Sequence, residues 1–212
     1  MAFDAVGTLI YPQPAAVDVY RETGRRCGVD LPVAEIRRRF QAALHRFRAP
    51  LEGLDESTER QRWRGIVAAV FDARKDLAAS LFDELWRHFS QPESWRVFED
   101  VEPAFRALDE RQILFGIASN FDQRLVEICR ASPILARCRF LHHSAELGFA
   151  KPHPQFYRAV EQRLSLQPAQ ILMVGDDLTN DYTAPLAAGW QAVRVQRKRQ
   201  MTLHHVIASL GE

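Results

Sequence analysis

The chain has 212 residues, of which 47% are hydrophobic and 26% charged, and its formal net charge is +1. Such a composition is typical of a globular protein with an ordinary core, and the balanced charge gives no overall field that would attract nucleic acid or a membrane surface. The length favours one core domain that carries a smaller insertion. No apolar run reaches the ~20 residues of a membrane span, and the three cysteines form no CxxC pair. We therefore expect a cytoplasmic protein with reduced thiols and with neither a nucleic-acid nor a membrane partner.

The first predicted element is a short apolar strand that ends in a carboxylate. The stretch "FDAVGTLI" occupies residues 3–10, so Asp4 follows the strand and Gly7 and Thr8 come next. A carboxylate at a strand end followed by Gly-Thr indicates a catalytic edge. The apolar Val6, two residues after Asp4, is unexpected in a polar site.

Residues 13 to about 95 carry helical patterns and few strand signals. Apolar residues recur at helical spacing in four stretches, which are "AAVDVYRETGRRCG", "VAEIRRRFQAALHRFR", "ERQRWRGIVAAVFDA" and "LAASLFDELWRHF". This pattern predicts an all-helical segment of about four helices.

The remainder of the chain alternates between strand and helix signals. Apolar runs typical of strands occupy residues 113–119, 138–144, 171–176 and 191–195. Helical stretches separate them at 121–131, 154–164 and 180–188. Strands that alternate with helices predict an α/β fold with a parallel sheet covered on both faces.

Polar side chains stand close to the ends of these apolar runs, where ligands bind in open parallel sheets. They comprise carboxylates, a hydroxyl, an amide and a lysine held before Pro152, namely Asp4, Ser119, Asn120, Lys151, Asp176, Asp177 and Asp181. Carboxylates from separate strands bind a hard cation such as Mg²⁺. Lys151 and Ser119 can hold a phosphoryl group while Asp4 attacks phosphorus to form an aspartyl-phosphate.

Four of these segments together resemble the signatures of the haloacid dehalogenase (HAD) superfamily of hydrolases. In chain order they are "FDAVGTL", "GIASN", "KPHPQFY" and "VGDDLTND". Each alone is a weak signal, but all four in order, each beside an apolar run, form a specific one. The segments "SNFDQRL" and "KPHPQFY" are most similar to the subgroup of haloacid dehalogenase-like hydrolase domain-containing protein 3.

The resemblance implies a doubly wound, Rossmann-like core at residues 1–12 and 97–212, with a helical type 1 cap at 13–96. It implies a short central strand that ends at Asp4. It also implies Asp4 and Lys151 as catalytic residues, and a phosphate site at Thr8, Ser119, Asn120 and Lys151. The implied Mg²⁺ site consists of Asp4, the main-chain carbonyl of Val6, Asp176, Asp177 and Asp181. The expected substrate is a small phosphorylated molecule.

Val6 departs from the family pattern, because the phosphatases of the family carry there a second aspartate that protonates the leaving group and then activates water. Loss of such a group costs ~10²–10⁴-fold in rate, whereas the Val6 carbonyl can still bind a metal. Metal-free dehalogenases have a tyrosine at this position and lack the acidic cluster that is present here, so the cluster argues against that class. Phosphonatases use a cap lysine. The single lysine of residues 13–96 is Lys75, which lies in a polar stretch typical of a loop or helix end, so the phosphonatase class is disfavoured.

Other interpretations remain for individual residues and for the whole chain. Asp4, Ser119 or Asn120 can cap a turn, Lys151 can be a solvated loop charge, and Asp177 or Asp181 can cap a helix that begins near Asn180. The favoured function is a slow Mg²⁺-dependent phosphomonoesterase. The alternative is a catalytically silent relative that binds a phosphorylated ligand or a protein partner. The sequence does not determine the substrate or the oligomeric state.

Overall fold

A five-stranded parallel sheet forms the centre of the larger part of the molecule. The computed structural model describes residues 1–48, 52–73, 75–197 and 202–209. The strand order is β5-β4-β1-β6-β7, with β1 at Ala2–Phe3, β4 at Gly116–Ser119, β5 at Leu141–His143, β6 at Leu172–Gly175 and β7 at Gln191–Arg194. The strand β1 lies in the middle although it has only two residues. This confirms the prediction of a short central strand ending at Asp4.

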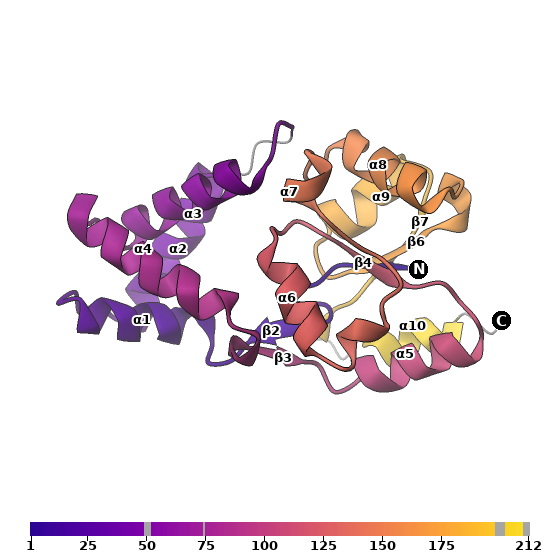
Figure 1. Ribbon diagram of the computed structural model, residues 1–212, viewed down its shortest axis with the longest axis horizontal. Helices are drawn as coiled ribbons and strands as arrows, with labels where there is room; N and C mark the ends of the chain where they lie inside the picture. The colour runs from indigo at the N-terminus through magenta and orange to yellow at the C-terminus, as the bar shows by residue number, and fades with distance from the viewer. Residues whose placement is uncertain (49–51, 74, 198–201, 210–212) are drawn as a thin grey trace.

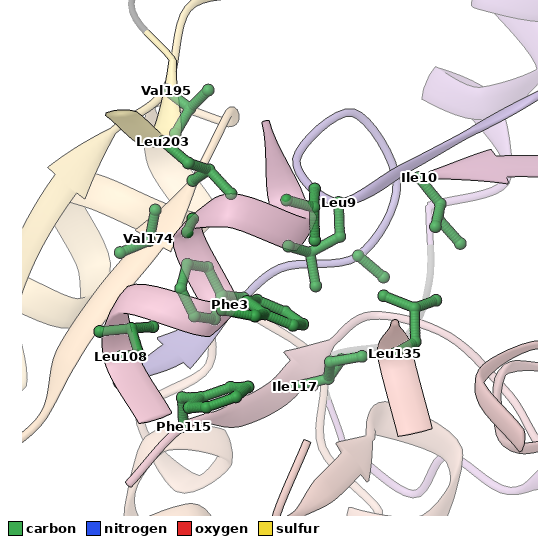
Figure 2. Close-up of a cluster of buried hydrophobic side chains, with 14 of the residues drawn as sticks. Phe3, Leu9, Ile10, Leu108, Phe115, Ile117, Leu135, Val174, Val195 and Leu203 are labelled. Atoms are coloured by element: carbon green, nitrogen blue, oxygen red, sulfur yellow. The ribbon is translucent and has the colours of Figure 1, made fainter. Parts of the chain in front are cut away.

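Alternate residues of the strands face two different helical layers. Phe3 lies in register with Ile117 on one side and with Val174 on the other, and all three are buried in one apolar cluster. Figure 2 shows these side chains together with Leu108 and Leu203. The helices that contribute to this cluster are α5 (Val101–Glu110), α6 (Arg124–Ala131) and α10 (Leu203–Ser209).

The opposite face of the sheet packs against a second set of helices. Ala2, Ala118 and Met173 are fully buried there with Tyr157 and Trp190. The helices on this side are α7 (Ser144–Leu147), α8 (Pro154–Leu164) and α9 (Ala184–Ala187). Helices on both faces of a parallel sheet confirm the predicted doubly wound α/β fold. The period-2 alternation within strands of two to four residues is what separates the two layers.

The helical segment, α1 to α4, forms its own apolar cluster beside the sheet (Figure 1). Its helices are α1 (Ala16–Arg26), α2 (Val33–Arg46), α3 (Glu56–Phe71) and α4 (Lys75–Ser90). Tyr20 of α1 stacks on Phe71 of α3 with ring centroids 5.8 Å apart. The helix α3 begins after Asp55, whose carboxylate accepts a hydrogen bond from the Thr58 N–H. Four helices therefore lie where the sequence predicts them.

A two-stranded antiparallel ribbon connects the helical segment to the sheet (Figure 1). Its strands are β2 (Ile10–Pro12) and β3 (Trp95–Val97), and Pro12 pairs with Trp95. The sequence does not predict this ribbon, because strands of three residues are too short to establish a periodicity. The ribbon lies at the predicted boundaries of core and cap, and the exact division into domains remains a prediction.

Two further expectations concern membranes and thiols. Within the described ranges no helix combines the length and the apolar character that crossing a bilayer requires. Cys27, Cys129 and Cys138 are free thiols, and burial raises the pKa of Cys129 to about 12. A thiol with so high a pKa is a weak nucleophile at neutral pH.

Candidate active site

The loop after β1 brings Asp4 to the carboxyl edge of the sheet. The Asp4 N–H donates to the Val174 carbonyl at 2.9 Å, and the chain then turns tightly, with the Leu9 N–H donating to the Ala5 carbonyl at 2.8 Å. Gly7 has φ +89°, and a Cβ there would lie 2.6 Å from Asp176 Oδ2. A glycine at this position therefore lets Asp176 approach the loop that carries Asp4.

Lys151 lies at the centre of the site and joins two carboxylates. Its Nζ donates to Asp4 Oδ1 at 2.9 Å, to Asp181 Oδ1 at 2.6 Å and to the Ala118 carbonyl at 3.1 Å. Its side chain is 1% exposed. Burial alone would lower the pKa of Lys151, but the charges of Asp181 and Asp4 outweigh it and raise that pKa above its usual value. Lys151 is therefore a buried ammonium ion and not a solvated loop charge.

Ser119 and Asn120, which follow β4, fix the positions of Asp4 and Lys151. The Ser119 hydroxyl donates to Asp4 Oδ1 at 2.9 Å. The Asn120 side chain donates to the Lys151 carbonyl at 2.8 Å and accepts from the Lys151 N–H at 2.7 Å. These two hydrogen bonds orient the Lys151 main chain, so a positioning role is added to the predicted role of Asn120 in phosphate binding.

Three carboxylates gather around Lys151. Oxygen atoms of Asp4, Asp176 and Asp181 all lie within 4.8 Å of one another. Burial raises the pKa of Asp181 to about 6, against the opposing effect of Lys151, and burial with the charge of Asp4 raises the pKa of Asp176. Three negative charges against one ammonium leave a formal charge of −2 when every group is ionised. A hard dication such as Mg²⁺ fits both this charge and this set of oxygen donors.

Two other predicted residues lie outside this cluster of three carboxylates. Asp177 Oδ1 accepts the N–H groups of Thr179 at 2.9 Å and Asn180 at 2.7 Å, so it caps the π-helical turn Thr179–Thr183. Thr8 is fully buried, and its hydroxyl donates to Asp176 Oδ1 at 3.3 Å. The contact of Thr8 is thus with a carboxylate of the cluster, and its predicted contact with phosphate remains a prediction.

A cavity of about 270 Å³ opens over the cluster, and it is called the acidic cavity below. It is lined by Asp4, Val6, Ser119, Asn120, Lys151, Asp176, Asp177, Asn180 and Asp181. Val6 is 38% exposed, so an apolar side chain faces solvent at the position where the family carries its second aspartate. Eight of the nine predicted site residues therefore line one cavity, and Thr8 supports it through Asp176.

Several supporting residues were not identified from the sequence. Arg197 pairs with Asp100 and also donates to the Thr8 carbonyl, which connects the loop after β1 to the start of α5. Arg194 Nε donates to the Asp176 carbonyl at 2.9 Å. Both arginines belong to the basic stretch "RVQRKRQ" (194–200), which suggests a surface patch; its residues 198–200 lie outside the described residues. The binding partners of Arg194 and Arg197 lie far away along the chain, so no local sequence pattern indicates these contacts.

Gly175, like Gly7, leaves room for a carboxylate of the cluster that a larger residue would displace. A Cβ at Gly175 would lie 2.3 Å from Asp181 Cγ, so only glycine allows Asp181 to reach Lys151 in this way. The hydroxyl of Tyr157 donates to the Asn180 carbonyl at 2.7 Å and holds the turn that carries Asp181. Gly175 lies inside the segment "VGDD", but its contact with Asp181 follows only from the three-dimensional arrangement.

Comparison with known proteins assigns the chain to a family. The family of haloacid dehalogenase-like hydrolases matches residues 1–189. Haloacid dehalogenase-like hydrolase domain-containing protein 3 of Mus musculus is 30% identical over 206 residues, which cover 92% of this chain and 80% of that protein. The chain therefore belongs to the haloacid dehalogenase-like hydrolases, and its predicted similarity to the domain-containing protein 3 subgroup is confirmed.

Solved structures share the fold at lower identity. A HAD phosphatase from Thermococcus onnurineus aligns with TM-score 0.70 and 21% identity, covering 99% of this chain and 96% of that one. The putative HAD-hydrolase YfnB from Bacillus subtilis, described as bound to magnesium, aligns with TM-score 0.77 and 16% identity, covering 100% and 97%. These alignments confirm the fold class.

Proposed function

We propose that the protein hydrolyses a small phosphomonoester through an aspartyl-phosphate on Asp4, with Mg²⁺ as cofactor. One observation carries the proposal: a buried lysine and three carboxylates converge at the carboxyl edge of the sheet with a formal charge of −2. A silent scaffold has no use for such a cluster, because burying each charged group costs several kcal/mol and one ammonium offsets only part of the charge of three carboxylates.

Each residue of the cluster has a task in this reaction. Asp4 Oδ2 is the attacking atom, because Oδ1 already accepts hydrogen bonds from Ser119 and Lys151. Lys151 and Ser119 hold the carboxylate and offset negative charge as phosphorus is attacked. Asp4, the Val6 carbonyl, Asp176 and Asp181 would hold the cation, with Asp177 at the rim of the same cavity. When bound, Mg²⁺ supplies charge stabilisation for the phosphoryl oxygens.

Val6 sets the limit of this chemistry. An apolar side chain cannot protonate a leaving group, so esters of poor leaving groups should turn over slowly. A family relative described as bound to magnesium supports the choice of cation. The apolar side chain of Val6, in place of an acid, also favours a second candidate function. In that case the protein binds a phosphorylated ligand without hydrolysing it.

The test is an assay of the purified protein on phosphomonoesters, with p-nitrophenyl phosphate as the reactive reference and 2-chloropropionate as the haloacid control. We expect phosphate release that requires Mg²⁺ and stops with EDTA, and no chloride release. Chloride release without metal would assign the dehalogenase reaction. Tight binding of phosphate compounds without any turnover would favour the silent relative.

A further inference from the structure

A second cavity, called the aromatic pocket here, lies between the helical segment and the sheet. Its volume is about 330 Å³, and Val6 and Asn120 line both this pocket and the acidic cavity. The two cavities therefore meet at Val6, the position where phosphatases of the family carry their second aspartate. A group attached to a phosphate at Asp4 would extend past Val6 into the aromatic pocket.

Aromatic rings form a large part of the walls of the aromatic pocket, most of them from the helical segment and Trp95 from β3. They include Tyr20, Phe40, Trp63, Trp86, Phe89 and Trp95. Aromatic side chains favour another ring by offset or edge-to-face contact, beyond the effect of area alone. A volume of about 330 Å³ is near the lower limit of the ~300–1,000 Å³ of ligand pockets, which suits one or two rings.

The charged residues that line the aromatic pocket are paired with one another. Arg62 binds Glu59, with Nε 2.9 Å from Oε2, and Arg124 binds Asp122, with Nη2 2.6 Å from Oδ2. Both carboxylates are almost fully buried, at 6% and 1% side-chain exposure. The amide of Asn120 is engaged by the Lys151 main chain. A second phosphate, a carboxylate or a polyhydroxylated sugar would thus meet arginines whose charge is already balanced by a buried carboxylate, and would lose its own hydrogen bonds to water.

We infer that the substrate is an aryl phosphate, the monophosphate of an uncharged phenol with one or two rings, whose ring enters the aromatic pocket. The inference rests on the proposed function. It also accounts for the missing acid at Val6: a phenol has a pKa of about 10, as tyrosine does, and leaves as a phenolate without the proton that an alkoxide requires. An apolar Val6 suits the path of a ring, whereas an aspartate there would have to be desolvated.

The reaction balances without an acid from the protein. Asp4 forms a bond to phosphorus, the bond between phosphorus and the aryl oxygen breaks, and its electron pair leaves on the phenolate, which takes a proton from solvent. Water then attacks phosphorus, the bond to Asp4 breaks, and the products are the Asp4 carboxylate and inorganic phosphate, with the remaining proton released to solvent.

The kinetic test compares kcat/KM for 2-naphthyl, phenyl, ethyl and glucose 6-phosphates in the presence of Mg²⁺. We expect 2-naphthyl phosphate to exceed phenyl phosphate by about tenfold, because a second ring buries more apolar area. Both should exceed the ethyl and glucose esters by at least about 10²-fold. Turnover of ethyl or glucose phosphate equal to that of the aryl esters overturns the inference and leaves the proposed hydrolysis standing.

The matched variants are Leu44→Asp and Leu186→Asp. Leu44 lines the aromatic pocket and is 37% exposed, whereas Leu186 is 46% exposed and lies on α9. Leu44→Asp should reduce the naphthyl-to-phenyl ratio to near one, and Leu186→Asp should leave it unchanged. An unchanged ratio in Leu44→Asp, with the protein folded by circular dichroism, counts against the aromatic pocket as the ring site.

A binding measurement separates this inference from the proposed function. Three of the four tryptophans, Trp63, Trp86 and Trp95, line the aromatic pocket. Phenylphosphonate, whose P–C bond is not hydrolysed, should therefore change the tryptophan fluorescence in the presence of Mg²⁺, and ethylphosphonate should not. That response without turnover of any ester overturns the hydrolysis and leaves an aryl phosphate binding site. No difference between the two phosphonates overturns the aromatic specificity.

Discussion

The acidic cavity and the aromatic pocket meet at Val6 but are built on different principles. The acidic cavity takes its side chains from strand ends of the sheet and from the loops that follow them, and those side chains are connected by ion pairs around Lys151. The aromatic pocket takes most of its walls from buried and half-buried residues of α1 to α4. In the proposed function, the acidic cavity is the reaction centre, where three carboxylates outnumber one ammonium, and the aromatic pocket is an apolar volume that selects the substrate. Chemistry and selectivity would then lie in separate parts of the fold, and mutations should separate them.

The largest effect is expected for the nucleophile. Asp4→Asn should lower kcat on p-nitrophenyl phosphate by about 10⁴-fold or more, because an amide cannot form the aspartyl-phosphate. Binding of phenylphosphonate, read by tryptophan fluorescence, should change far less. Asp83→Asn, on the exposed surface of α4, is the control and should match the wild type. Residual turnover in Asp4→Asn above a tenth of wild type would exclude Asp4 as nucleophile.

Lys151 allows a comparison of buried and exposed ion pairs. Lys151→Met leaves Asp4 and Asp181 buried without their cation, so the free energy of unfolding should fall by roughly 3–5 kcal/mol. The control Arg26→Met removes the exposed pair with Glu84 in the helical segment and should cost less than about 1 kcal/mol. Urea unfolding at pH 7 without Mg²⁺ measures both. Equal losses would contradict the assignment of Lys151 as the group that balances the cluster.

Val6 lines both cavities, so replacing it by an acid tests how the apolar side chain limits the reaction. Val6→Asp should raise the rate on an alkyl phosphate by about 10²-fold by restoring an acid, and less on an aryl phosphate. Val6→Asn, similar in size but without an ionisable group, is the control and should give no such gain. If Val6→Asp stays folded and binds Mg²⁺ yet is no faster on either ester, Val6 is not the limiting defect.

The cation site can be tested without turnover. Asp176→Ala should weaken Mg²⁺ binding at least about tenfold, as measured by calorimetry, because a hard oxygen ligand is lost. Asp181→Ala should act likewise, whereas Asp177→Ala should act less, since Asp177 caps the turn Thr179–Thr183. Unchanged Mg²⁺ affinity in Asp176→Ala would rule out the proposed metal site.

The smallest effect concerns a surface pair in the helical segment. Hydrogen bonds from Arg38 and Arg39 hold the pKa of the half-buried Glu35 carboxyl at about 2. Because this folded-state pKa lies below the unfolded value of about 4.3, the pair stabilises the fold at neutral pH and loses that effect as the pH falls toward 2. The difference in Tm between wild type and Glu35→Gln should therefore be small at pH 7 and shrink further in acid. A difference that grows in acid would contradict this sign.

The reaction centre was more predictable than the pocket, for a physical reason. Strand ends of a parallel sheet meet at one edge, so Asp4, Ser119 and Asp176 could be placed together from the order of apolar runs alone. Asp177 and Asp181 could not be told apart, because each stands where it can either cap a turn or face the cation. Asp177 accepts the N–H groups of Thr179 and Asn180, and this capping contact depends on the exact backbone of the π-helical turn.

The aromatic pocket could not be predicted in the same way. Helical periodicity indicates that Phe40 and Trp63 lie on apolar faces. It does not indicate which part of such a face remains open to a ligand, since that depends on how the four helices pack. The pairing of Arg62 with Glu59 and of Arg124 with Asp122 is likewise hidden among many similar charges in the sequence.

The ribbon of β2 and β3 has a consequence for how such a protein can change over evolutionary time. The chain leaves the sheet at Pro12 and returns at Trp95, and these two residues are paired side by side. An insertion whose ends are adjacent imposes little on the geometry of its host, because closing the host chain across it needs no rearrangement. The whole length between Pro12 and Trp95 can therefore be lengthened, reshaped or exchanged as a module. If the aromatic pocket selects the leaving group as we infer, a new preference can arise there while the cluster around Lys151 keeps its arrangement.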